Sequence, residues 1–169
     1  GNGMTAAEDR AHFSLWCMMA APLILGNDIT DMTPETLATI TNKEVIAIDQ
    51  DPLGVQGLRL RKDGDLQYWF KPLSGGDWAF CILNTGEEAA TVAVDWASLE
   101  VNDSLSGRRT DFATVNYSVK DLWNASAKPF TTLVKGKGKL RGKMVQNPAE
   151  AVVGSHDVAV FRLTPVSGK

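Results

Sequence analysis

The hydrophobic positions in the first third of the chain follow helical spacing and are interrupted once. Thr5-Ala6-Ala7-Glu8 matches a capping box, so a helix is predicted from there to about Ala20. Thr33-Pro34-Glu35 places a capping hydroxyl before a proline and predicts a second helix over about 34–41. Asn42 can cap a further helix over 43–49.

Between these helices lies a continuous apolar run, Leu23-Ile24-Leu25, which follows Pro22 and closes at Gly26-Asn27-Asp28. This pattern is typical of a strand that is buried on both faces of a parallel sheet. Such a strand cannot stand alone. Residues 1–53 therefore predict helix, strand, helix, helix, which is the tail of an α/β pattern.

After Gly54 the pattern changes to the two-residue alternation of strands, with turn sequences such as Asp63-Gly64 between them. Short strands separated by turns predict an antiparallel β-sandwich. We therefore divide the chain into an α/β part, 1–55, and an all-β sandwich, 56–169. The predicted strands are Leu58–Arg61, Leu66–Phe70, Trp78–Leu83, Thr91–Trp96, Tyr117–Val119, one around Val145, and Val158–Leu163.

Composition and charge narrow the classes of function. The chain has 169 residues, 44% hydrophobic and 22% charged, as in ordinary globular proteins. A net charge of −3 argues against a nucleic-acid-binding domain. The longest apolar run, Leu15–Leu25, is broken by Pro22 and falls short of the roughly 20 residues that cross a bilayer. Cys17 and Cys81 are too few for a disulfide framework or a cysteine-rich zinc site, and we expect neither a metal nor a cofactor.

Two acidic segments are candidates for chemistry. Asn27 and Asp28 follow the predicted buried strand, and the carboxyl ends of parallel strands are where α/β barrels assemble their active sites. A role in fixing the loop is the interpretation we favour over substrate contact. Asp49 and Asp51 could flank a scissile bond as paired glycosidase carboxylates. We favour a helix end and a proline-containing turn that links two domains.

Three further patterns have a structural explanation that we prefer. Ser155-His156-Asp157 contains the residue types of a hydrolase triad, but adjacent residues on a strand point to opposite faces, so a turn is expected. His12 has no second histidine nearby and is expected to be a structural residue of a buried helix. The basic stretch 135–143 lacks aromatic residues for base stacking and predicts a solvated loop or edge strand.

Several segments match a known family in order. They are Gly1-Asn2-Gly3-Met4-Thr5, Arg10–Trp16, Ala20–Ile29 and Asn42–Gly57, with looser matches at Asp121-Leu122-Trp123, His156-Asp157-Val158 and Phe161-Arg162-Leu163. Together they resemble the melibiase-type α-galactosidases of glycoside hydrolase family 27. The resemblance covers nearly all of residues 1–57 and is therefore specific.

The resemblance implies a (β/α)8 barrel followed by an antiparallel β-sandwich. In that family two aspartates perform retaining hydrolysis of terminal α-galactosides, one as nucleophile and one as general acid/base. Both lie upstream of the Gly-Asn-Gly segment, so the resemblance transfers no catalytic residue to this chain. It makes 5–20 the seventh barrel helix and 23–25 the eighth strand, with Asn27 and Asp28 on the active-site rim. It also makes the start at Gly1 a cut through a larger protein.

The sequence therefore predicts the C-terminal part of an α-galactosidase-like hydrolase that is inactive alone and needs the missing barrel, or a partner chain, to be soluble. Its partners would be terminal α-galactoside sugars, with no nucleic acid and no membrane. Family members are commonly secreted, periplasmic or lysosomal, which is the expectation for its compartment. The sister activities α-N-acetylgalactosaminidase and β-L-arabinopyranosidase are close alternatives, because sugar-selecting residues lie mostly upstream.

A non-catalytic carbohydrate-binding module is an alternative of another class. It would use exposed tryptophans as a sugar-stacking platform, and the four candidates are Trp69, Trp78, Trp96 and Trp123. In alternating strands such residues more often belong to the core. The module requires that two or more of them be coplanar and face solvent.

Overall fold

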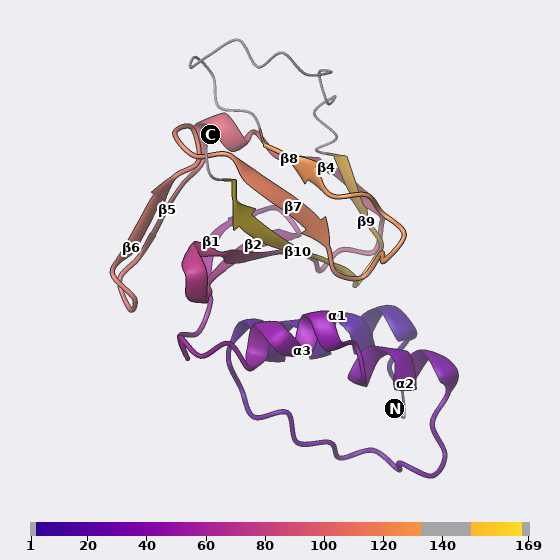
Figure 1. Cartoon of the computed structure of the whole chain (residues 1–169). Coiled ribbons are helices and arrows are strands. Elements are labelled where there is room, and N and C mark those ends of the chain that lie inside the picture. Colours follow the sequence, from indigo (N-terminus) through magenta and orange to yellow (C-terminus); the bar gives the residue numbers. More distant parts are fainter. Residues whose placement is uncertain (1–2, 133–149, 167–169) are drawn as a thin grey trace.

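A computed structural model describes residues 3–132 and 150–166, and these form three layers (Figure 1). Helices make one outer layer, a six-stranded antiparallel sheet the middle layer, and two two-stranded sheets the other outer layer. The antiparallel sandwich predicted from the alternating pattern is confirmed. The predicted strand around Val145 and the basic stretch 135–143 lie outside the described residues.

The helices lie where the capping residues predict them, at α1 (Ala6–Met18), α2 (Pro34–Ile40) and α3 (Lys43–Asp49). The capping box of α1 is complete: the Glu8 amide donates to Thr5 Oγ1 at 3.3 Å, and the Thr5 amide donates to Glu8 Oε2 at 2.7 Å. Thr33 and Asn42 cap α2 and α3 through their side-chain oxygens, which accept hydrogen bonds from backbone amides of the first turn. Local chemistry therefore fixes where each helix starts.

The strand predicted at Leu23–Leu25 is wrong for this chain. The segment has no regular secondary structure, and the side chains of Ile24 and Leu25 are 84% and 47% exposed. A strand that is buried on both faces needs a hydrogen-bonded neighbour and cover on each face. The described residues supply neither, so the apolar run remains an extended, exposed connection between α1 and α2.

The middle sheet has the strand order β1-β2-β3-β10-β7-β8, and every neighbouring pair is antiparallel. Its strands are β1 (Leu58–Asp63), β2 (Leu66–Pro72), β3 (Trp78–Asn84), β10 (Val158–Pro165), β7 (Tyr117–Asp121) and β8 (Phe130–Thr131). The smaller sheets pair β4 (Ala90–Ala93) with β9 (Glu150–Val153), and β5 (Glu100–Asp103) with β6 (Arg108–Asp111).

The pattern predicted a strand over Thr91–Trp96, but β4 ends at Ala93 and Trp96 opens a short 3-10 helix, Trp96–Ser98. Asp95 caps that turn by accepting a hydrogen bond from the Ala97 amide at 3.1 Å. A polar residue that can cap a turn therefore ended the strand earlier than the apolar pattern indicated.

The central strand β3 is buried along its whole length, because both faces of the middle sheet are covered. Trp78, Phe80 and Ile82 point into the core between the sheets. Ala79, Cys81 and Leu83 point to the other face and pack with the buried side of α1 and α3. The alternation of large and small side chains along β3 therefore separates an aromatic sandwich core from a smaller core beneath the helices.

The four candidate tryptophans do not form an exposed platform. Trp78 and Trp96 are 0% and 5% exposed and belong to the aromatic core. Trp69 and Trp123 are half-buried and pack on the helix side of the sheet, where Trp123 Nε1 donates to Ser14 Oγ at 3.0 Å. The carbohydrate-binding module therefore lacks the coplanar, solvent-facing pair on which it depends.

Candidate functional site

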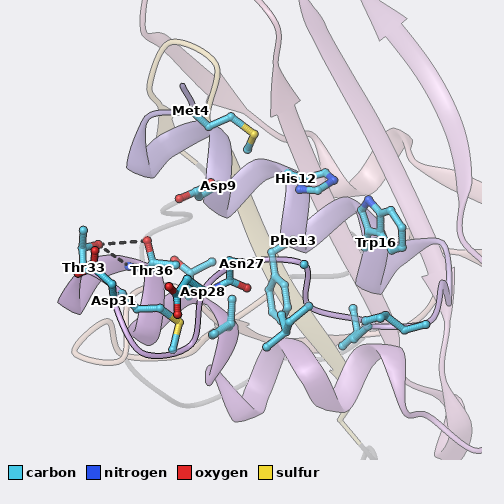
Figure 2. Close-up of a pocket in the computed structure, with 17 residues that line it drawn as sticks. Met4, Asp9, His12, Phe13, Trp16, Asn27, Asp28, Asp31, Thr33 and Thr36 are labelled. Atoms are coloured by element: carbon cyan, nitrogen blue, oxygen red, sulfur yellow. Dashed lines mark hydrogen bonds between the residues drawn. The ribbon is translucent and has the colours of Figure 1, made fainter. Parts of the chain in front are cut away.

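A hollow of about 660 Å³ lies on the side of α1 that faces away from the sandwich. α1 supplies residues spaced three and four apart, which share one face of a helix: Asp9, His12, Phe13 and Trp16. The opposite wall is formed by the connection that runs through residues 23–33 and by one side of α2 (Figure 2).

Asn27 and Asp28 both line this hollow, as does Asp31 (Figure 2). Asp28 is engaged locally, because its Oδ1 accepts hydrogen bonds from the Thr30 amide at 2.8 Å and from Thr30 Oγ1 at 2.7 Å. These two bonds favour the ionised carboxylate and lower the pKa of Asp28 below its usual value. Asp28 therefore fixes the conformation of its loop, which is the interpretation that the sequence favoured.

Asn27 differs from Asp28, because its side-chain nitrogen Nδ2 is buried and has no hydrogen-bond partner in the described chain. A buried polar group without a partner costs roughly 1–3 kcal/mol. The side-chain amide of Asn27 therefore keeps a hydrogen-bond donor that no residue around it accepts.

The hollow is lined by polar and apolar residues in similar proportion, and several of the large apolar side chains on and near its walls are exposed. Trp16 is 37% exposed, Ile24 84% and Leu25 47%, and Ile29 and Leu37 nearby are 70% and 47% exposed. Large apolar side chains exposed close together are typical of a surface that binds another protein segment or a ligand. His12 is exposed here and packs edge-on to the Trp16 ring, with ring centroids 5.6 Å apart, so the helix is less buried on this side than expected, and the structural role of His12 stays a prediction.

On the opposite side of α1, the turn that joins the helices to the sandwich is held by a buried carboxylate. Asp51 is 8% exposed and accepts three hydrogen bonds: from the Leu53 amide at 3.0 Å, the Ser74 amide at 2.8 Å and Ser74 Oγ at 2.9 Å. It therefore ties the turn after α3 to the connection between β2 and β3. Asp51 links the two parts of the chain, as expected, and does not stand opposite Asp49 as a catalytic carboxylate.

The bonds to Asp51 predict how stability depends on pH. Burial raises the pKa of Asp51, but the hydrogen bonds from Leu53 and Ser74 and the charge of Arg162 outweigh it, so the pKa is lowered. A carboxyl with a lowered folded-state pKa stabilises the fold above its unfolded pKa, and the contribution is lost as the pH falls through the folded value. Asp51→Asn should lower the free energy of unfolding by about 1–3 kcal/mol at pH 7.

Urea unfolding of the original chain and of Asp51→Asn, compared at pH 7 and near pH 3, checks this prediction. The difference between the two proteins should shrink at the acid pH, because the unfolded chain then binds a proton that the folded Asp51 resists. The matched control is Asp111→Asn, because Asp111 is an exposed carboxylate that accepts a single backbone bond, from the Ala113 amide at 2.9 Å. A difference for Asp51→Asn that stays constant between the two pH values would contradict the assignment.

The third sequence candidate, Ser155-His156-Asp157, is a turn before β10, as expected. Asp157 accepts Arg10 Nε at 3.0 Å and Arg10 Nη2 at 2.5 Å, which makes a bidentate pair with α1. Ser155 Oγ donates to the Gly86 carbonyl oxygen at 3.0 Å and lies 2.9 Å from His156 Nδ1, and His156 adopts a left-handed backbone with φ +51°. The carboxylate is therefore committed to Arg10, and these residues do not form a triad.

Cys17 and Cys81 are both free and buried in the core beneath the helices. Burial raises the pKa of Cys17 to about 12 and also raises that of Cys81, so both stay protonated thiols at neutral pH. Within 3–132 and 150–166, His, Cys, Asp and Glu side chains form no group of three that could hold a metal ion. None of the helices described there is both long and apolar enough to span a membrane.

Comparison with known proteins identifies the family. Residues 63–163, more than half of the chain, match the family described as "Alpha galactosidase C-terminal beta sandwich domain", and residues 1–51 match "Alpha galactosidase A". This chain belongs to the melibiase family of α-galactosidases. The resemblance seen in the sequence is thereby confirmed.

Relatives in this family are similar along almost the whole chain. An α-galactosidase A of Cellvibrio japonicus is 38% identical over 98% of this chain, which covers 37% of that protein. An α-galactosidase of Coffea arabica is 37% identical over 98% of this chain and 38% of its own length. The chain thus spans a little over a third of the length of these family members.

A solved family structure has the same fold. The α-galactosidase I of Mortierella vinacea superimposes with a TM-score of 0.70 at 26% identity, over 99% of this chain and 38% of the solved one. A β-L-arabinopyranosidase of Geobacillus stearothermophilus, at 20% identity and a TM-score of 0.69, shares the fold. Both parts of this chain therefore have counterparts in solved enzymes.

Proposed function

We propose that this chain is the C-terminal part of a retaining glycoside hydrolase that removes terminal α-D-galactosyl residues. The observation that carries the proposal is the hollow on α1, with Trp16, Ile24 and Leu25 exposed on its walls, in a chain that spans little more than a third of its α-galactosidase relatives. Residues 1–55 would complete a (β/α)8 barrel, and 56–169 would form the sandwich behind it. The catalytic aspartates would belong to the preceding part of the barrel.

The role of the described residues follows from the hollow. Barrel strands that pair with 23–25 would supply the neighbours that this apolar run lacks, and would cover Ile24 and Leu25. Asn27 and Asp28 would then lie at the carboxyl end of the eighth strand, the edge where barrels build active sites.

The experiment extends the chain upstream by the residues encoded before Gly1 and tests three chromogenic substrates: an α-D-galactopyranoside, an N-acetyl-α-D-galactosaminide and a β-L-arabinopyranoside. We expect kcat/KM for the α-galactoside to exceed the other two by about tenfold or more, because one added or missing group is worth roughly 10–200-fold in such pockets. The released galactose should keep the α configuration.

The three substrates also define the contrary results. Preference for either other glycoside would assign the sister activity instead of the α-galactosidase. Release of β-galactose would contradict the retaining mechanism. Hydrolysis of none of the three, by a folded protein, would overturn the assignment as a glycosidase of this specificity.

A further inference from the structure

The C-terminal end of α1 has a strained backbone. Ala20 has φ +52°, in the left-handed region that glycine adopts most easily. Its amide donates to the Cys17 carbonyl at 3.3 Å, and the next amide, of Ala21, donates to the Trp16 carbonyl at 3.1 Å. These two bonds form the Schellman turn that ends many helices, here with alanine in the usual glycine position. Such strain persists only where surrounding groups fix the backbone.

Two of the groups that fix this turn come from the sandwich. The Gly57 amide donates to the Met18 carbonyl at 2.7 Å, and Lys71 Nζ, on β2, donates to the Cys17 carbonyl at 3.0 Å. Lys71 is 1% exposed. A buried ammonium group therefore sits at the negative end of α1, where a positive charge is favourable.

Burying Lys71 is costly, so its presence needs a reason. Burial lowers the pKa of Lys71, while the negative charges of Asp49 and Asp51 oppose that shift. If the side chain only filled space, an apolar residue of similar volume would stabilise the fold as much as a buried charge does, or more. A lysine differs from such a side chain in that it aims a donor at one carbonyl oxygen, and so specifies one position for the end of the helix.

The position of this turn sets the starting point of the connection between α1 and α2. Residues 21–28 leave the turn directly and run along the wall of the hollow to Asn27 and Asp28 (Figure 2). We propose that Lys71 is a positioning residue: from the sandwich, it fixes the end of α1 and thereby the path of the rim segment that carries Asn27 and Asp28. This inference rests on the proposed glycosidase function, and it assigns to the sandwich a part in setting substrate affinity.

The test uses the upstream-extended polypeptide with Lys71→Met and Lys71→Arg. Because displacements of about 1 Å can cost up to about 100-fold in rate, we expect Lys71→Met to lower kcat/KM roughly 5- to 100-fold, mainly through a higher KM. Lys71→Arg keeps the buried charge but moves the donor atoms, so its kcat/KM should be intermediate. A purely structural role would reduce the amount of active enzyme, and hence the apparent kcat, while leaving KM unchanged.

The matched control is Arg10→Met, which removes the other cationic side chain that joins α1 to the sandwich. Arg10 lies more than two helical turns before Ala20 and bonds Asp157. Because it does not contact the strained turn, its loss should change KM less than about twofold. Hydrogen exchange provides a readout that does not depend on turnover. In Lys71→Met, but not in Arg10→Met, exchange at the Ala20 and Ala21 amides should become faster.

The outcomes separate this inference from the proposed function. If the original extended protein hydrolyses none of the three glycosides, the proposed function fails, and amide exchange still decides whether Lys71 holds the turn. If it is active and both Lys71 variants keep the original KM and the original amide exchange, the positioning role is overturned. Should Lys71→Met not fold, Lys71→Arg decides alone, and an unchanged KM in that variant would refute the proposal.

Discussion

Trp78→Ala should lower the free energy of unfolding of the sandwich by about 3–5 kcal/mol. The side chain is 0% exposed, and it lies in the aromatic core with its ring edge-on to Phe70, centroids 6.1 Å apart. Its Nε1 donates to Thr110 Oγ1 at 3.1 Å, so truncation leaves an unpaired hydroxyl as well as a cavity. The same ring also supports the guanidinium of Arg108, 5.3 Å from its centroid.

Urea denaturation followed by far-ultraviolet circular dichroism measures this effect. Leu105→Ala is the control, because Leu105 is 64% exposed in the turn between β5 and β6, and its truncation should change stability by no more than about 0.5 kcal/mol. If Trp78→Ala and Leu105→Ala proved equally mild, the aromatic core would not be the main source of stability of the sandwich.

Gly57→Ala should destabilise the contact between the helices and the sandwich, at a cost of about 1–3 kcal/mol. A Cβ atom at Gly57 would lie 3.0 Å from the Met18 carbonyl oxygen, 3.1 Å from the Phe70 carbonyl oxygen and 3.3 Å from Lys71 Cβ. Two of these are backbone atoms, one in α1 and one in β2, so neither can rotate away. The added methyl group would also strain the bond from the Gly57 amide to Met18.

The matched control is Gly26→Ala, since a Cβ atom there would meet nothing within 4 Å. Thermal unfolding of both variants, together with hydrogen exchange across α1, distinguishes the two sites. We expect a lower midpoint and faster exchange at the end of α1 for Gly57→Ala alone. Equal stability of the two variants would mean that the helices and the sandwich do not approach each other closely at Gly57.

The sequence predicted what depends on local chemistry and missed what depends on contacts between distant segments. The helices were predictable because Thr5, Thr33 and Asn42 are N-cap residues at their N-termini. The double burial of β3 had a signal, since Trp78–Leu83 has no polar residue at alternate positions, but the same run also fits a sandwich strand with one buried face. The prediction of a strand at 23–25 was wrong because a strand needs hydrogen-bonded neighbours, and the described residues provide none there.

The strands β5, β6, β8 and β9 were also missed, for a related reason. They have two to four residues each, and in β5 and β6 the buried positions are Val101, Asp103 and Thr110, of which only Val101 is apolar. Too few apolar positions remain for a period to be recognised. The roles of Gly57 and Lys71 had no local signal at all, because each acts on a carbonyl of α1 about 40 or more residues away.

The same limit applies to the candidate site. Asn27 and Asp28 could be selected because they follow an apolar run in a recognisable family segment. Their bonding could not be predicted, since Asp28 is engaged by Thr30 while Asn27 Nδ2 is left without a partner. The exposed apolar side chains around them become meaningful only with the fold, which shows that α1 gives one face to the sandwich and the other to the hollow.

The central claim is that these residues brace and complete a catalytic barrel and do not hydrolyse glycosides alone. Turnover of a chromogenic α-D-galactopyranoside, measured side by side for the purified 169-residue chain and for the upstream-extended polypeptide, tests it most directly. We predict turnover by the extended polypeptide and none above background by the chain alone. Turnover by the chain alone that survives repurification, or none by a folded extended polypeptide, would contradict the account.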